Sequence, residues 1–140
     1  MNEDVTMESG EKKPGKVLII DDDPVFLKII AEYVNERFPD LRVFTFEDPV
    51  EGLAHIDSDV DLLVTDLEMP NVDGGKILAY AKDRGVNKMR IIILSSRDAD
   101  YLHLKFPLGT CLAVLNKHEA RQRDALDMVF DSLQKKCAFG

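Results

Sequence analysis

Hydrophobic positions along the chain fall into two alternating patterns. Short runs of consecutive apolar residues are separated by stretches in which apolar residues recur every three or four positions. Uninterrupted apolar runs are typical of strands buried on both faces of a parallel sheet, and the spaced pattern is typical of amphipathic helices. We therefore expect strands over 16–21, 41–46, 61–66, 90–95 and 111–116, and helices over 24–37, 48–57, 75–84, 98–106 and 119–135.

The order of these elements predicts the fold class. Strands and helices alternate along the chain, which favours an α/β fold with a doubly wound, five-stranded parallel sheet and helices on both faces. A chain of 140 residues is long enough for one domain. We expect this domain to span 16–136. The polar segment 1–15, which ends in Pro14-Gly15, is expected to be a disordered tail.

The net charge of the chain limits the classes of partner that it can bind. The net charge is −8 at pH 7 and the isoelectric point is about 4.8, whereas direct nucleic-acid binding needs a basic face. We expect neither nucleic acid nor a membrane as a partner. No segment resembles a signal peptide or a membrane span, which favours the cytoplasm. Of the two cysteines, Cys111 is expected in the core and Cys137 as a free thiol in a C-terminal tail.

Four of the predicted strands end in polar side chains. The first ends in Asp21-Asp22-Asp23, the third in Asp66, the fourth in Ser95-Ser96, and the fifth near Lys117. In open parallel sheets, ligands bind outside the carboxyl ends of the strands. Carboxylates, a hydroxyl and an ammonium group are therefore expected to converge on one small site.

The acidic residues of this site predict a bound cation. If Asp21, Asp22 and Asp66 lie together, their like charges raise the pKa of one carboxyl strongly unless a positive ion binds. Mg²⁺, a hard cation with oxygen ligands, is the ion that we expect. The alternative is that the first acidic run only favours a helix start, and that Asp66 only precedes a turn.

Taken together, these segments resemble the receiver domain of the response-regulator family in two-component signalling, a CheY-like domain. The resemblance covers about residues 16–135 and implies the flavodoxin-like arrangement of the α/β sandwich. Its specificity lies in the order and spacing of the matching segments, which are Val17-Leu18-Ile19-Ile20-Asp21-Asp22-Asp23, Asp61-Leu62-Leu63-Val64-Thr65-Asp66-Leu67-Glu68-Met69-Pro70-Asn71-Val72-Asp73-Gly74, Ile91-Ile92-Ile93-Leu94-Ser95-Ser96 and Lys117.

The resemblance implies a function and a set of partners. It implies a phosphoacceptor rather than an enzyme that acts on a separate substrate, although such a domain also promotes its own phosphorylation and dephosphorylation. The implied phosphodonor is a phosphohistidine on a sensor histidine kinase or a histidine phosphotransfer protein. The implied output is a switched protein-interaction face, and a second copy of the chain is among its candidate partners.

The resemblance also implies a role for individual residues. Asp66 resembles the phosphoacceptor. Asp21 and Asp22 resemble the acidic pair that binds Mg²⁺, with Asp66 and the backbone carbonyl of Glu68 as further ligands. Ser95 resembles the hydroxyl that engages the phosphoryl group.

Three further positions complete the implied site. Lys117 resembles the lysine that pairs with the phosphoryl group. Glu68 and Arg97 resemble two variable positions that flank the site and tune the lifetime of the acyl phosphate. Their opposite charges either pair across its mouth or both point into solvent.

The sequence departs from the family pattern around the lysine. In the family the lysine is usually followed by proline, but here His118 follows, and Lys117 comes one position later than is common when counted from Gly109. Either the preceding loop carries an insertion, as we expect, or Asn116 takes the place of the lysine. Three positions before the lysine, where the family often has an aromatic residue, the chain has Val114.

Two alternative functions stay open at this point. The irregular region around Lys117 is compatible with an interaction module that keeps the fold and works without phosphorylation. The less favoured alternative is a phosphatase of the haloacid-dehalogenase type, because Asp21-Asp22-Asp23-Pro24-Val25 after an apolar strand also resembles the first motif of that family.

Overall fold

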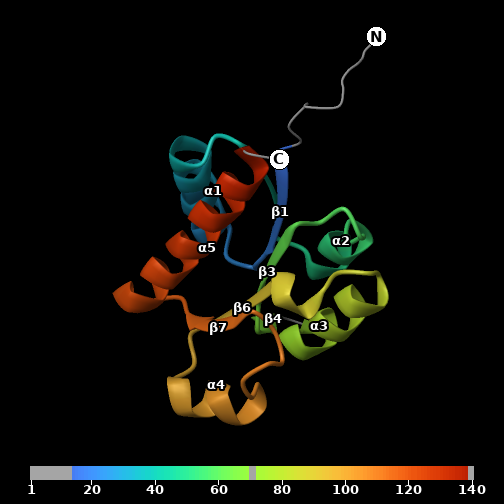
Figure 1. Ribbon diagram of the computed structural model, residues 1–140. Helices are drawn as coiled ribbons and strands as arrows, with labels where there is room; N and C mark the ends of the chain where they lie inside the picture. The colour runs from blue at the N-terminus through green and yellow to red at the C-terminus, as the bar shows by residue number, and fades with distance from the viewer. Residues whose placement is uncertain (1–13, 70–71, 139–140) are drawn as a thin grey trace.

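The computed structural model describes residues 14–69 and 72–138. Strands and helices alternate as the sequence predicts (Figure 1). In chain order the elements are β1 (Gly15–Ile20), α1 (Pro24–Arg37), β2 (Leu41–Phe46), α2 (Pro49–Ala54), β3 (Leu62–Asp66), β4 (Glu68–Met69), β5 (Val72–Asp73), α3 (Gly74–Asp83), the 3₁₀ turn η1 (Lys88–Arg90), β6 (Ile91–Ser95), α4 (Ala99–Lys105), β7 (Ala113–Asn116) and α5 (Ala120–Ala138).

The predicted α/β fold with a five-stranded parallel sheet is confirmed. The strand order is β2-β1-β3-β6-β7, and all four pairings between neighbours are parallel. The chain therefore runs from β1 outward to β2, and then back past β1 through β3 to the other edge. This reversal beside β1 is the topological switch point at which doubly wound sheets bind ligands.

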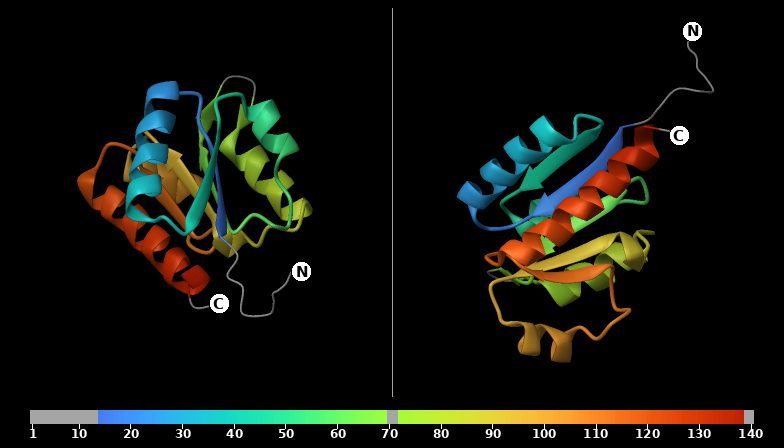
Figure 2. Two further views of the ribbon diagram at one scale, coloured as in Figure 1. Left: turned by 90° about the horizontal axis from the view of Figure 1, so that it is seen from above. Right: turned by 60° about the vertical axis from the view of Figure 1, so that its left-hand side comes forward.

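Alternate residues of the central strands enter two separate cores. Leu18 and Ile93 pack in the core with α2, α3 and α4, whereas Ile19 and Ile92 pack in the core with α1 and α5. The two pairs of helices α1 with α5 and α2 with α3 accordingly cover opposite faces of the sheet (Figure 2). Strands β3 and β6 are buried along their whole length, which explains why their sequences are continuous apolar runs.

The starts of three helices are explained by their capping residues. The side chain of Asp23 accepts hydrogen bonds from the backbone N–H groups of the first turn of α1, and Asp48 and Asp98 cap α2 and α4 in the same way. In α1 and α2 a proline follows the cap directly, where its missing N–H costs no helical hydrogen bond.

The structure corrects several predicted boundaries. Gly15, which we expected in the tail, is the first residue of β1, whereas the rest of the predicted tail except Pro14 lies outside the described residues. Helix α2 ends at Ala54, three residues before the predicted end, because the N–H of His55 turns back to the carbonyls of Gly52 and Leu53. Helix α5 continues to Ala138, so Cys137 belongs to this helix rather than to a tail. Cys111 is buried, as predicted.

The segment after Asp66 also differs from its prediction. No strand was predicted between Asp66 and the third helix, but Glu68–Met69 and Val72–Asp73 pair as a two-stranded antiparallel ribbon, with Glu68 opposite Asp73. Part of the predicted turn, at 70–71, lies outside the described residues. In the described part of the chain no helix is both long enough and apolar enough to cross a membrane.

Candidate functional site

The register of the sheet brings the predicted polar residues to one edge. Ile20 at the end of β1 pairs with Thr65 of β3, so Asp21 and Asp66 both follow at the same level. On the other side of β3, Asp66 pairs with Leu94 of β6, directly before Ser95. One carboxylate oxygen from each of Asp21, Asp22 and Asp66 lies within 4.8 Å of the others. The predicted acidic cluster is therefore present.

The three carboxylates differ in their exposure to solvent. Asp21 is fully buried and Asp66 is 7% exposed, whereas Asp22 is exposed. One oxygen of Asp21, Oδ1, accepts a hydrogen bond of 2.9 Å from the backbone N–H of Asp23. The cluster thus combines two buried carboxylates with one that solvent reaches.

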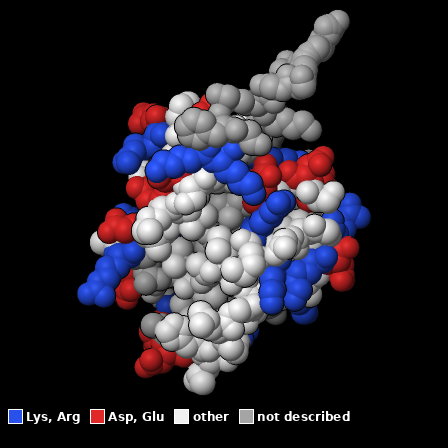
Figure 3. Space-filling view, in the orientation of Figure 1, with Lys and Arg blue, Asp and Glu red and all other residues white. Residues whose placement is uncertain are grey.

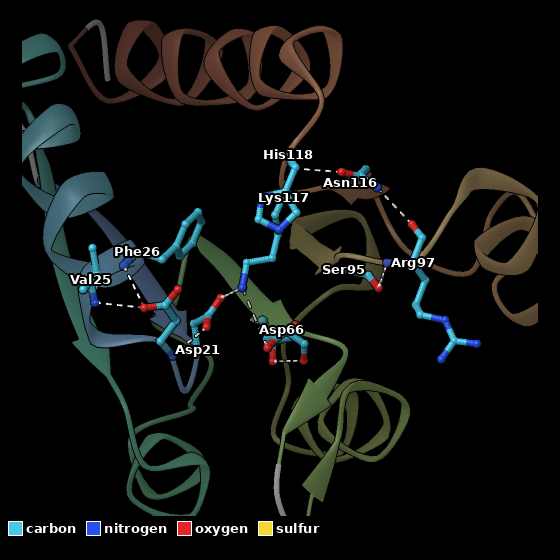
Figure 4. A network of polar contacts seen from close by, with 11 residues as sticks. Asp21, Val25, Phe26, Asp66, Ser95, Arg97, Asn116, Lys117 and His118 are labelled. Atoms are coloured by element: carbon cyan, nitrogen blue, oxygen red, sulfur yellow. Dashed lines mark hydrogen bonds and ion pairs between the residues drawn. The ribbon is translucent and has the colours of Figure 1, made fainter.

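Lys117 is the basic residue that faces this cluster (Figure 4). Its ammonium nitrogen lies 2.7 Å from Oδ2 of Asp21 and 3.9 Å from Oδ2 of Asp66. Only 10% of its side chain is exposed. The same nitrogen lies 4.7 Å from the centre of the Phe26 ring, so an aromatic face from α1 covers the ion pair.

Burial dominates the electrostatics of the two inner carboxyl groups. Removal from water, together with the nearby charge of Asp21, raises the pKa of Asp66 to about 7, against the lowering effect of the Lys117 ammonium. Burial also raises the pKa of Asp21, against the lowering effect of its contact with Lys117. One ammonium group therefore does not offset the cost of holding these carboxylates out of water.

The donor set fits a divalent cation. Oδ2 of Asp21 is buried, and beside the ammonium of Lys117 at 2.7 Å the described residues offer it no further partner. A buried carboxylate oxygen whose lone pairs are only partly satisfied is costly. Together with nearby oxygens of Asp22 and Asp66 it offers the hard ligands that Mg²⁺ prefers.

Ser95 lies at the end of β6 on the other side of Asp66. It is almost fully buried, and its Oγ accepts a hydrogen bond of 2.9 Å from the backbone N–H of Arg97. A hydroxyl that accepts in this way keeps its own proton as a donor. The backbone carbonyl of Ser95 accepts from the N–H of Lys117 at 2.9 Å, which joins the ends of β6 and β7.

Glu68 and Arg97 pair across the mouth of the site. The Arg97 guanidinium donates to Oε2 of Glu68 at 3.0 Å, and about half of each side chain is exposed. The guanidinium also stacks on the ring of Tyr101, with 3.9 Å between its carbon and the ring centre. Of the two alternatives for these charges, the structure shows pairing.

Comparison with known proteins decides the family. The sequence model of the response regulator receiver domain matches residues 17–126, which is more than half of the chain. The chain belongs to this family. It is therefore a receiver domain of the two-component response-regulator type, and the phosphatase alternative is not favoured.

Relatives of this receiver domain include longer proteins. The chain is 29% identical over 138 residues to a protein-glutamate methylesterase/protein-glutamine glutaminase from Nitrobacter winogradskyi, with 94% of this chain and 32% of that protein covered. It thus spans about a third of the length of this relative.

Solved structures show the same fold. A response regulator receiver domain protein from Clostridium thermocellum superposes with a TM-score of 0.69 at 26% identity, covering 87% of this chain and 95% of that one. The response regulator TrrA from Thermotoga maritima, solved in complex with Mg(2+)-BeF, superposes with a TM-score of 0.68 at 20% identity, covering 85% and 98%.

Three contacts of this receiver domain were not predicted from its sequence. Phe26 lies within the predicted helix 24–37, and nothing in the sequence indicated that its ring lies against the ammonium of Lys117. Tyr101 supports Arg97, and the only signal for this pair is its spacing of four residues. Asn116, considered only as a replacement for the lysine, instead donates to the backbone carbonyl of Arg97.

Proposed function

We propose that this receiver domain accepts a phosphoryl group on Asp66 from a phosphohistidine of a sensor histidine kinase or a histidine phosphotransfer protein. The observation that carries the proposal is the position of Lys117, whose ammonium contacts the buried carboxylates of Asp21 and Asp66 at the carboxyl ends of the strands. A residue that departs from the family spacing in sequence nevertheless lies beside the proposed acceptor. We also place this reaction in the cytoplasm.

The chemistry is an in-line transfer of a phosphoryl group. A carboxylate oxygen of Asp66 bonds to phosphorus while the phosphorus–nitrogen bond of phosphohistidine breaks, and the released imidazole takes up a proton. The product is an acyl phosphate. The carboxylates of Asp21, Asp22 and Asp66, with the backbone carbonyl of Glu68, would hold Mg²⁺. Bound Mg²⁺ supplies positive charge that neutralises the phosphoryl oxygens.

Lys117 and Ser95 have complementary roles in this proposal. Lys117 already lies 3.9 Å from the Asp66 oxygen, so its ammonium is placed to pair with an oxygen of the phosphoryl group. The hydroxyl of Ser95 keeps its proton, because Oγ accepts from the N–H of Arg97. It can therefore donate to a second oxygen.

The Glu68–Arg97 pair is proposed to set how long the acyl phosphate survives. The pair spans two segments that flank Asp66, namely β4 and the loop after β6. Stacking on Tyr101 restrains the guanidinium in this position. We infer that the pair hinders the approach of water to the phosphorylated carboxyl group.

The output is proposed to be a protein-interaction face that responds to this modification. On the face drawn in Figure 3, the described Lys and Arg side chains lie interspersed with Asp and Glu. Together with the net charge of −8, this mixed surface supports a protein partner, or a second copy of the chain, rather than nucleic acid.

The test is phosphorylation by a small donor. Acetyl phosphate with Mg²⁺ is expected to add one phosphoryl group to the intact protein, visible by mass spectrometry and removable by hydroxylamine. Asp66→Asn is expected to abolish the adduct, whereas Asp59→Asn, an exposed carboxylate in the loop before β3, is expected to leave it unchanged. A hydroxylamine-resistant adduct on Ser95 or Ser96 would overturn the mechanism. Absence of any adduct would favour the phosphorylation-independent module.

A further inference from the structure

We propose that Asn116 is a positioning residue for phosphoryl transfer, because its side chain ties the turn that carries Lys117 to the turn that carries Ser95. The inference rests on the proposed function and adds a residue to it. Asn116 is the last residue of β7, and it pairs with Ser95 of β6 in the sheet. It is half-buried.

The side chain of Asn116 makes two hydrogen bonds of opposite sense (Figure 4). Its Oδ1 accepts from the backbone N–H of His118 at 2.8 Å, which closes a tight turn around Lys117. Its Nδ2 donates to the backbone carbonyl of Arg97 at 3.0 Å. Because an N–H group can meet only the amide oxygen, and a carbonyl only the amide nitrogen, the two contacts fix the same orientation of the side chain.

The backbone of Arg97 is consequently held on both sides. Its N–H donates to Oγ of Ser95 and its carbonyl accepts from Asn116. The first contact occupies a lone pair of the Ser95 hydroxyl and leaves its proton for a phosphoryl oxygen. The hydrogen bond from Asn116 to the Arg97 carbonyl restrains the loop after β6 beside β7.

The side chain of Asn116 therefore affects both groups that are proposed to contact the phosphoryl group, namely the Lys117 ammonium and the Ser95 hydroxyl. Beyond the strands, the turn of Lys117 and the turn of Ser95 are joined by the hydrogen bond from the Lys117 N–H to the Ser95 carbonyl and by the side chain of Asn116. Losing the side-chain contact leaves the hydrogen bond from the Lys117 N–H to the Ser95 carbonyl. We therefore expect the ammonium and the hydroxyl to be less well placed relative to each other, which slows transfer more than it changes folding.

Asparagine meets a requirement that few residues meet. The position needs an acceptor for the N–H two residues ahead and a donor that reaches across to the neighbouring loop. Serine can supply the acceptor, but its hydroxyl is too short to reach the carbonyl of Arg97 as well. The substitution Asn116→Ser therefore removes the tie, keeps the turn, and changes no charge.

Asn87 provides a matched control. Its Oδ1 accepts from the backbone N–H of Met89 at 2.8 Å, which is the same local turn. It caps η1 before β6, at the end of the sheet opposite to Asp66. Asn87→Ser makes the same chemical change away from the site.

The experiment compares both variants with the wild-type protein. With acetyl phosphate and saturating Mg²⁺, Asn116→Ser is expected to form the acyl phosphate about tenfold more slowly, and Asn87→Ser at the wild-type rate. The Mg²⁺ dissociation constant of Asn116→Ser is expected to stay within about twofold of the wild-type value. The two hydrogen bonds described for the Asn116 amide are made with backbone groups of Arg97 and His118, and not with the acidic cluster. A merely structural role would change the midpoint of urea unfolding without a specific effect on this rate.

A second measurement is independent of phosphorylation. Hydrogen exchange at the Arg97 N–H is expected to be faster in Asn116→Ser than in the wild-type protein and in Asn87→Ser. The proposal requires both results, and a wild-type rate of phosphorylation or unchanged exchange at Arg97 overturns it. If the wild-type protein takes up no phosphoryl group, the proposed function fails. Hydrogen exchange at the Arg97 N–H in Asn116→Ser, compared with the wild-type protein, then still shows whether Asn116 holds the two turns together.

Discussion

Replacement of Asp66 by asparagine is expected to stabilise the metal-free protein at alkaline pH. Asp66 is 7% exposed, and burial together with the charge of Asp21 raises its pKa from 3.8 to about 7. The native state therefore holds the Asp66 proton more tightly than the unfolded chain does. At about 1.4 kcal/mol for each pKa unit, this difference amounts to about 4 kcal/mol.

The sign of this effect follows from proton linkage. Between pH values of about 4 and 7 the native state binds more protons at Asp66 than the unfolded state, so this group makes the free energy of unfolding fall as the pH rises. The stability that the bound proton provides is complete below about pH 4 and is lost as the pH passes through about 7. The asparagine side chain is neutral at every pH, so the free energy of unfolding of the variant does not fall at this position as the pH rises. It also removes a negative charge near Asp21, whose pKa is raised as well.

Urea unfolding in the presence of a chelator tests this expectation. At a pH of about 8, Asp66→Asn is expected to exceed the wild-type free energy of unfolding by about 3 to 4 kcal/mol, and at a pH of about 4 the gain is expected to vanish. The control is the exposed Asp59→Asn, for which no such gain is expected. Adding Mg²⁺ is expected to stabilise the wild-type protein more than the variant, because the variant lacks the charge of one proposed ligand. Equal stabilities at the higher pH, or a gain that does not depend on pH, would refute the reasoning.

Three further substitutions separate the proposed roles. Asp22→Asn is expected to raise the Mg²⁺ dissociation constant about tenfold or more by calorimetry, because it removes the charge of an exposed carboxylate that we propose as a ligand. An unchanged constant would exclude Asp22 from the site. Lys117→Ala is expected to slow phosphorylation by acetyl phosphate about a hundredfold while Mg²⁺ still binds, and a wild-type rate would contradict its role. Arg97→Ala is expected to shorten the lifetime of the acyl phosphate severalfold in a hydrolysis assay, whereas Lys135→Ala, which breaks an exposed ion pair within α5, is expected to have no effect. A longer lifetime in Arg97→Ala would show that the Glu68–Arg97 pair does not shield the site.

The fold was predictable because its central strands carry an unambiguous signal. Strands β3 and β6 are buried on both faces, so their first residues form continuous apolar runs and polar residues appear only toward their carboxyl ends. The Asp-Pro pairs at 23–24 and 48–49 mark two helix starts. The errors lie where the signal is weak. The β4–β5 ribbon pairs only two residues from each strand, which is too short for an alternating pattern.

Convergence of the acidic residues with Lys117 was predictable, but the contacts that surround them were left open or were not predicted. The register of the parallel strands fixes where the backbones of Asp21 and Asp66 lie, independently of the rotamers of their side chains. The choice of partner depends instead on the rotamers of long side chains and on loop backbones. Glu68 and Arg97 are 29 positions apart and lie in different segments. The hydrogen bond from Asn116 to the Arg97 carbonyl depends on the position of a backbone group, which a sequence pattern does not indicate.

The position of the lysine shows why strand register is a better guide than counting from a loop. Counted from Gly109, either Asn116 or Lys117 can take the family position, since the intervening loop can vary in length. In the sheet, Ser95 pairs with Asn116, so Lys117 is the first residue beyond β7. Leu115 holds this register, because it is buried in the core formed with α1 and α5. A slip by one residue would move Leu115 to the opposite face of the sheet. Burial of an apolar residue two positions earlier therefore decides that a lysine, and not an asparagine, faces Asp66.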